Sequence, residues 1–230
     1  MSFSSSLLSI SPVDGRYANK VDALRNSVSE YALQFFRVKV ELRWLKHLSE
    51  TSQISEIPRL SESALLYLSN IETNFSLADG EAIKNIERTT NHDVKAVEYF
   101  IKKKFQSQPE LHAMSEFVHF ACTSEDINNL SYALMIQKAH KEVILPQLQK
   151  LQAQLIGFSS LFAEQPMLAR THGQTASPTT VGKEFANISA RLHRQKQQAE
   201  SFQFLGKING AVGNFNAEEI APTLFLFTQI

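Results

Sequence analysis

Residues 123–164 have the sequence TSEDINNLSYALMIQKAHKEVILPQLQKLQAQLIGFSSLFAE. Apolar side chains recur along this stretch at helical spacing, from Ile127 and Leu130 to Phe162, and its only proline is Pro146. Spacings of three and four residues place such side chains on one face of an α-helix. Because proline breaks or bends a helix, we predict one kinked helix or two nearly collinear helices here.

A second amphipathic helix is predicted nearer the N-terminus. Apolar side chains follow the same spacing from Val28 to Leu48, and Ser27 and Glu30 stand three residues apart. A serine followed by a glutamate at this distance is typical of a capping box, so we expect the helix to begin at Ser27.

The composition also favours helices. The chain has 8 glycines and 7 prolines in 230 residues, roughly half of the average usage of about 12%. Too few turn-formers remain for a many-stranded β protein. We therefore expect an all-α protein with a small helical domain over residues 1–110, part of a central helical bundle over residues 111–217, and an atypical tail over residues 218–230.

Charge and cysteine content exclude several classes of protein. The 23 basic and 23 acidic residues give no formal net charge, which excludes a strongly basic nucleic-acid binder. Cys122 is the only cysteine, so a disulfide scaffold and an all-cysteine metal site are excluded. Residues 1–10 lack the features of a signal peptide, and no apolar run approaches 18 residues. We expect a cytoplasmic protein that binds neither membrane nor nucleic acid.

Two polar segments lie ahead of the long helices. Arg16 and Tyr17 follow a turn-rich sequence and could hold a phosphate through guanidinium and phenol groups, although such a dipeptide is common. In Thr90-Asn91-His92-Asp93, an amide, an imidazole and a carboxylate adjoin at the start of a predicted helix. Either Asn91 or Asp93 caps this helix and His92 is an ordinary surface histidine, or the segment contacts an anion.

Thr123-Ser124-Glu125-Asp126 opens the longest helical stretch. The segment has the spacing of a capping box. The same hydroxyls and the free N–H groups of a helix start could instead cradle a carboxylate or phosphate. That alternative requires Glu125 and Asp126 to be turned outward, because their charges would repel an anion.

Residues 170–174, Arg-Thr-His-Gly-Gln, form the strongest catalytic candidate. Histidine can donate a proton to a leaving group at neutral pH, and Gly173 permits close approach of the backbone to a ligand. A lone histidine is more often structural, so both roles for His172 stay open. We expect a polar loop here, followed by a helix capped by Ser177 with Pro178 in its first position. The sequence has no zinc-binding HExxH spacing and no phosphate-binding glycine loop, and we expect no metal.

Taken together, these segments resemble those of the adenylosuccinate lyase family of the fumarase/aspartase superfamily, in order and spacing, over residues 8–217. The resemblance implies a homotetrameric helical enzyme that cleaves a C–N bond without a cofactor. Such enzymes release fumarate from adenylosuccinate, giving AMP, and from succinylaminoimidazole carboxamide ribotide in purine biosynthesis. The reaction is a β-elimination through a carbanion-like intermediate.

The resemblance also assigns roles to residues. It implies that His172 is the general acid, that Thr123 and Ser124 bind the succinyl carboxylate, and that Arg16 and Tyr17 hold the nucleotide. The full set of substrate-binding positions that it implies is Arg16, Tyr17, Asn91, His92, Asp93, Thr123, Ser124 and Thr171.

One element of the family pattern is missing from the sequence. The loop signature Gly-Ser-Ser-x-Met-Pro-x-Lys-x-Asn, whose serine is taken as the base, does not occur in the 230 residues. We therefore expect an N-terminal half, with a truncated bundle and no activity of its own. The alternatives are a non-catalytic helical fragment or association module, and a sister lyase acting on argininosuccinate or fumarate, which the Arg16-Tyr17 and Asn91-His92-Asp93 matches disfavour.

Overall fold

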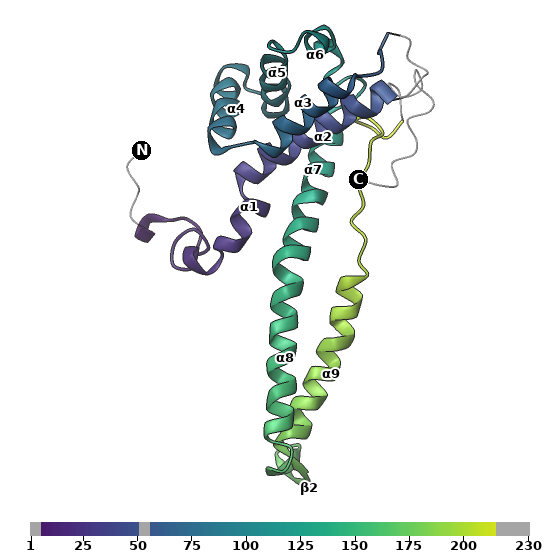
Figure 1. The fold of residues 1–230 in the computed structure, drawn as a ribbon. Coiled ribbons are helices and arrows are strands. Elements are labelled where there is room, and N and C mark those ends of the chain that lie inside the picture. The colour runs from purple at the N-terminus through teal and green to yellow at the C-terminus, as the bar shows by residue number, and fades with distance from the viewer. Residues whose placement is uncertain (1–5, 51–55, 215–230) are drawn as a thin grey trace. The chain divides into compact units, whose positions relative to one another are not determined.

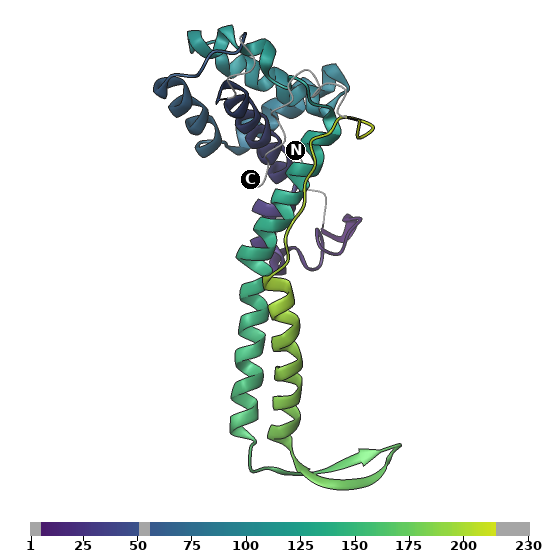
Figure 2. The same ribbon diagram turned by 90° about the vertical axis from the view of Figure 1, so that its right-hand side faces the viewer.

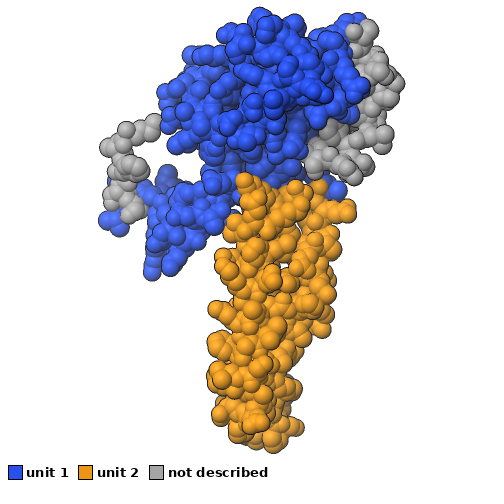
Figure 3. Space-filling model, in the orientation of Figure 1, with its two compact units in different colours: residues 1–136, 205–230 blue, residues 137–204 orange. Residues whose placement is uncertain are grey.

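The structure is a computed structural model that describes residues 6–50 and 56–214. The chain divides into two compact units, residues 1–136 with 205–230 and residues 137–204, coloured blue and orange in Figure 3. The predicted tail, residues 218–230, lies outside the described residues. The described helices and strands longer than five residues are α2 (Glu30–Glu50), α3 (Glu62–Thr73), α4 (Leu77–Thr90), α5 (Asp93–Phe105), α7 (Ser124–Ala139), α8 (Leu145–Leu161), β1 (Pro166–Thr171), β2 (Gln174–Thr180) and α9 (Val181–Glu200).

Short elements connect these helices. Helix α1 (Arg25–Val28) precedes α2, α6 (Pro109–Ala113) follows α5, and a π-helical turn (His140–Ile144) joins α7 to α8. The predicted interruption by Pro146 is confirmed, since Pro146 lies in the first turn of α8 directly after that widened turn. A proline ring removes one helical hydrogen bond and crowds the preceding turn, which a π-turn relieves.

The first unit is built around α2, which packs against α3, α4 and α5 (Figure 1). Val38, Leu42, Leu45 and Leu48 lie along α2 in the predicted spacing and are buried in one apolar cluster with side chains of α3, α4 and α5. The indole N–H of buried Trp44 donates to the Phe120 carbonyl oxygen over 2.7 Å. The core of this unit therefore lies where the periodicity predicts it.

The predicted start of this helix is wrong by two residues. The chain is extended at Ser29, where ψ is 170°, so α1 and α2 are separate helices. The Ser29 hydroxyl accepts from the N–H of Ala32 over 3.2 Å and caps α2. Ser27 is instead buried within α1, because the serine next to the break is better placed to reach a free N–H group than the one inside the preceding turn.

The buried guanidinium of Arg37 joins three helices of the first unit. Its Nη2 donates to Asp93 Oδ2 at the start of α5, over 2.5 Å, and its Nε donates to Asn128 Oδ1 on α7, over 2.9 Å. Arg37 is 3% exposed. A buried guanidinium is stable only when charged and polar partners satisfy its N–H groups, so this contact fixes α5 and α7 against α2.

The second unit is a helical hairpin with a β-hairpin at its tip. Helices α8 and α9 run side by side, and the β1–β2 ribbon joins them (Figure 2). A side chain at Gly182 would place its Cβ 2.4 Å from the Ser159 carbonyl oxygen, so only glycine permits this approach. Phe158, Phe162 and Phe185 form an aromatic cluster between the two helices.

Helices dominate the fold as predicted, but the segment around His172 is not a loop before a helix. It forms an antiparallel pair of strands in which Pro166 pairs with Thr180 and Thr171 with Gln174. The predicted cap at Ser177 is wrong, because Ser177 lies within β2, and Thr180 caps α9 by accepting from the N–H of Lys183 over 3.2 Å. The threonines in this segment favour a strand. Pro178 has no N–H group to donate, which a two-stranded ribbon tolerates because both of its strands are edge strands.

A buried ion pair also lies in the first unit. His119 Nδ1 is 2.6 Å from Glu41 Oε1, and Glu41 Oε2 is buried without a hydrogen-bond partner in the described chain. Burial raises the pKa of Glu41. Burial alone would lower the pKa of His119, but the hydrogen bond and charge of Glu41, with a smaller contribution from Glu98 opposed by Lys95, raise it.

Replacing Arg37 by Met should lower the free energy of unfolding of the first unit by about 2–4 kcal/mol, because Asp93 and Asn128 lose a buried partner. Urea unfolding followed by fluorescence of Trp44, the only tryptophan, measures this loss. The matched control is Arg43→Met on the same helix, since Arg43 is half exposed and pairs with Glu72 at 3.3 Å. The control should cost less than about 1 kcal/mol, and equal losses in both variants would refute the role of Arg37.

The Glu41–His119 pair should make stability depend on pH. Both raised pKa values mean that the folded state holds the proton of the pair more tightly than the unfolded state. This contribution is fully present below the unfolded pKa of the groups and is lost as pH rises through their folded pKa. The free energy of unfolding should therefore fall from pH 6 to pH 9.

Glu41→Gln should flatten this decline, because it removes one titrating group and leaves His119 without the carboxylate that raises its pKa, and His112→Gln, at an exposed histidine, should keep it. Urea unfolding at a series of pH values compares the three proteins. An undiminished decline in Glu41→Gln would show that other groups cause it.

Candidate functional site

His92 occupies the start of α5. Its ring Nδ1 accepts from the N–H of Lys95 over 3.1 Å, so the histidine itself caps the helix. The predicted caps, Asn91 and Asp93, are wrong. Asn91 ends α4 in the left-handed conformation, with φ of 50°, and Asp93 is occupied by Arg37.

Asp93 is held as a carboxylate beside Arg37. Partial burial would raise the pKa of Asp93, but the Arg37 charge and the hydrogen bond from the N–H of Val94 outweigh it and lower the pKa. Asp93 therefore balances the buried guanidinium, and its role in the structure is at least partly that of a counter-ion.

The start of α7 leaves its hydroxyl groups uncommitted. Only half of the predicted capping box is present, since Asp126 Oδ2 accepts from the N–H of Thr123 over 2.9 Å. Neither hydroxyl of Thr123 and Ser124 has a hydrogen-bond partner in the described part of the chain, whereas the hydroxyls of Ser61 and Ser76 cap α3 and α4. The α7 start therefore retains donors for a ligand.

The two acidic residues beside these hydroxyls, Glu125 and Asp126, differ in their exposure. Glu125 is exposed, as an anion site requires. Asp126 is turned inward and is fully buried. Its Oδ1 accepts from Lys207 Nζ and from the N–H of Asn209, both over 3.1 Å, so the carboxylate is neutralised within the protein.

The starts of α5 and α7 adjoin one another. Arg37 bonds to both helices through Asp93 and Asn128. Val94 and Ile127, each in the first turns of its helix, belong to one buried apolar cluster with Val40 and Leu130. Two of the four predicted segments are thus brought together by α2.

Among the described residues, no contact connects Arg16 or Tyr17 to the starts of α5 and α7. The Arg16 guanidinium lies over the Tyr17 ring, 5.4 Å from its centroid. Tyr17 is about half exposed. Both groups are accessible to a ligand.

Thr171 and His172 lie at the tip of the β-hairpin in the second unit. His172 and Gly173 form a two-residue turn with φ of 52° and 78°. Positive φ at both positions is the requirement of a type I′ turn. Both Thr171 and His172 are exposed.

Residues in the left-handed conformation lie in or near the predicted segments. In the described chain, the four residues other than glycine with positive φ are Asn91, His119, Ala121 and His172. Two are predicted site residues, and His119 and Ala121 lie within four residues of Thr123. Left-handed conformations at non-glycine residues are uncommon and cluster at functional sites.

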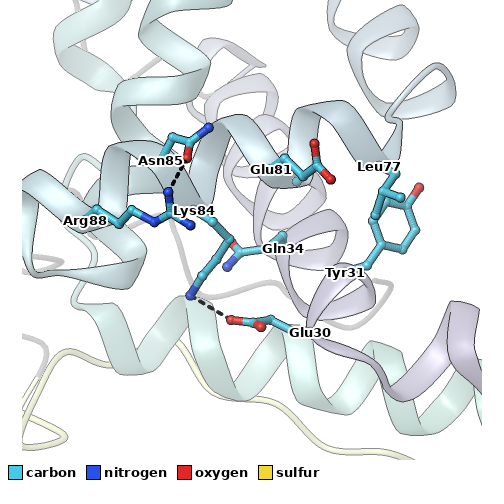
Figure 4. Close-up of a pocket in the computed structure, with 9 residues that line it drawn as sticks. Glu30, Tyr31, Gln34, Leu77, Glu81, Lys84, Asn85 and Arg88 are labelled. Atoms are coloured by element: carbon cyan, nitrogen blue, oxygen red, sulfur yellow. Dashed lines mark hydrogen bonds and ion pairs between the residues drawn. The ribbon is translucent and has the colours of Figure 1, made fainter. Parts of the chain in front are cut away.

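A pocket of about 410 Å³ between α2 and α4 contains none of the predicted residues (Figure 4). Its cation Lys84 lies between Glu30 and Glu87, at 2.7 Å from each, and Arg88 bonds to Asn85. Lys84 and Arg88 are therefore paired within the protein, whereas the buried Oε1 of Gln34 on the pocket wall has no hydrogen-bond partner among the described residues.

Two residues of the site were not predicted from the sequence. Gln34, Arg37 and Glu41 form a buried polar row on α2 at steps of three and four residues, a pattern that could have identified Arg37. Lys207 lies among the glycines from 206 to 213, and its contact with Asp126 spans 81 residues. Among the described residues there is no cluster suited to a metal ion, and no described helix has the length and apolar character to cross a membrane.

The curated relatives that match the chain include adenylosuccinate lyases from several bacteria. The chain is 56% identical over 213 residues to adenylosuccinate lyase of Escherichia coli strain K12, covering 93% of the chain and 47% of that protein. It is 53% identical over 221 residues to adenylosuccinate lyase of Vibrio cholerae serotype O1, covering 96% and 48%. The chain spans about half the length of the curated relatives it matches.

Solved structures share the fold. Fumarate lyase from Mesorhizobium sp. BNC1 superposes with a TM-score of 0.68 at 17% identity, covering 85% of the chain and 44% of that structure. A β-carboxy-cis,cis-muconate cycloisomerase from Acinetobacter calcoaceticus superposes with a TM-score of 0.62 at 18% identity, with the same coverage.

A model of the lyase family matches residues 15–230. The chain therefore belongs to the lyase family, and it resembles the N-terminal half of the adenylosuccinate lyases.

Proposed function

We propose that the chain supplies part of the active site of a cytoplasmic carbon–nitrogen lyase. The enzyme releases fumarate from adenylosuccinate, giving AMP, and from succinylaminoimidazole carboxamide ribotide. The observation that carries the proposal is the start of α7, where two hydroxyls stand uncommitted beside free helix N–H groups in a chain 56% identical to an adenylosuccinate lyase.

In this reaction the negative charge that most needs stabilisation develops on a carboxylate of the substrate. Removal of a proton next to a carboxylate produces a carbanion-like intermediate whose negative charge spreads onto that carboxylate. Thr123 and Ser124 can each donate one hydroxyl hydrogen bond to it, and the positive end of α7 adds to the stabilisation. Groups aligned in advance stabilise developing charge without reorganisation.

The nitrogen leaves as an amine, so it must gain a proton. We assign that donation to His172, because histidine serves as a general acid at neutral pH and because its side chain is exposed at the turn of the hairpin. Thr171 adjoins it as a substrate-binding residue. Asn91, His92 and Asp93 contact the substrate beside α7, and Arg16 and Tyr17 hold the phosphate of the nucleotide.

The base must come from outside the 230 residues. The serine-bearing loop signature of the family does not occur in them, so we propose a homotetramer in which this chain acts with the missing elements. Exposed apolar side chains on α8 and α9, among them Ile156, Leu161 and Ile188, support association with further helices. An association module without catalysis is the second candidate, and the same side chains favour it.

Mixing the chain with a polypeptide that carries the remaining half of the Escherichia coli relative tests the proposal. Fumarate release from adenylosuccinate, followed by absorbance, should appear in the assembled mixture and be absent from either part alone. His172→Ala should lower kcat in the mixture by about 10²–10⁴-fold while substrate still binds, since a general acid contributes roughly that much.

His193→Ala is the matched control, because His193 is exposed on α9 and has no assigned role. It should leave turnover within about twofold. Turnover by the chain alone would refute the need for the missing half, and unchanged turnover of His172→Ala would remove the acid role. An assembled but inactive mixture would favour the association module, and a preference for argininosuccinate would favour a sister lyase.

A further inference from the structure

The buried charge closest to the proposed carboxylate cradle is that of Asp126. It lies in the first turn of α7, two residues after Ser124, and is 0% exposed. A bare carboxylate at this position would oppose a second carboxylate at Ser124, because like charges close together in a protein interior repel strongly.

The glycine-rich segment supplies the compensating charge. Lys207 Nζ donates to Asp126 Oδ1 over 3.1 Å and to the Gly210 carbonyl oxygen over 2.8 Å. The segment is fixed to α7 by Asn129, whose side chain accepts from the N–H of Lys207 over 2.7 Å and donates to its carbonyl oxygen over 2.9 Å. Lys207 is thus held against Asp126 by both its backbone and its side chain.

Asp126 also supplies one half of a capping box at the start of α7. Its Oδ2 accepts from the N–H of Thr123, as Asp79 Oδ2 accepts from the N–H of Ser76 at α4, and the Thr123 hydroxyl has no hydrogen-bond partner in the described part of the chain. The Thr123 hydroxyl is then available as a donor.

We propose that Lys207 is a positioning residue that neutralises Asp126 and thereby allows the first turn of α7 to accept a carboxylate. The inference rests on the proposed function, since it concerns the same carboxylate cradle. Lys207 acts through Asp126 and not by touching the substrate.

Titration of the ¹⁵N-labelled chain with fumarate, followed by NMR at the amides of Thr123 and Ser124, tests the inference. Lys207→Met should weaken fumarate binding about tenfold, because the Asp126 charge is then uncompensated. Lys207→Arg keeps the charge and should bind within about threefold of the parent. Lys46→Met, which removes a half-exposed lysine from α2, should leave binding unchanged.

The double variant Asp126→Asn/Lys207→Met separates charge from folding. It removes both charges, so it should regain most of the affinity lost in Lys207→Met, whereas a purely structural role for Lys207 predicts no recovery. Thermal melts of every variant accompany the titrations.

Unchanged affinity in Lys207→Met, or no recovery in the double variant, would overturn the inference and leave the proposed function standing. A parent chain whose Thr123 and Ser124 amides do not respond to fumarate would overturn both.

Discussion

The interaction on which the first unit depends is the buried guanidinium of Arg37. It bonds to Asp93 at the start of α5 and to Asn128 on α7, and so fixes two helices that are separated by a turn-rich connection in the sequence. A charged group at 3% exposure is tolerated only with such partners. The same bonds place the starts of α5 and α7 together, so the packing of the core and the geometry of the candidate site have one cause.

Although the chain has no formal net charge, several of its charged side chains are buried in ion pairs. Arg37 with Asp93, Lys207 with Asp126, and His119 with Glu41 are ion pairs with at least one buried partner. Each joins segments far apart in the sequence, and two of them lie at predicted site segments. Replacing such pairs by apolar side chains is often neutral for stability, so their presence here is better explained by the positions they fix than by the stability they add.

The spacing of residues in the sequence predicted the helices, whereas the residue at which each helix begins depends on contacts in the folded chain. The spacing of apolar residues identified the core of α2, and Pro146 marked the interruption between α7 and α8. The starts were less predictable, because Ser27 and Ser29 both suit a cap and only the position of the chain break selects Ser29. The hairpin around His172 was missed since its threonines and Pro178 are compatible with a helix start as well as with a short strand.

The sequence identified the segments of the candidate site but not what organises them. Motifs at helix starts are visible locally, whereas the contacts of Arg37 and Lys207 span 56 and 81 residues and follow from the fold. That difference accounts for the residues that were not predicted, and the candidate site depends above all on the adjoining starts of α5 and α7. A crystal structure of the chain grown with fumarate tests this arrangement most directly. Fumarate density at the first turn of α7, bonded to Thr123 and Ser124 beside His92, is the predicted result, and well-ordered fumarate elsewhere with this turn empty would contradict the account.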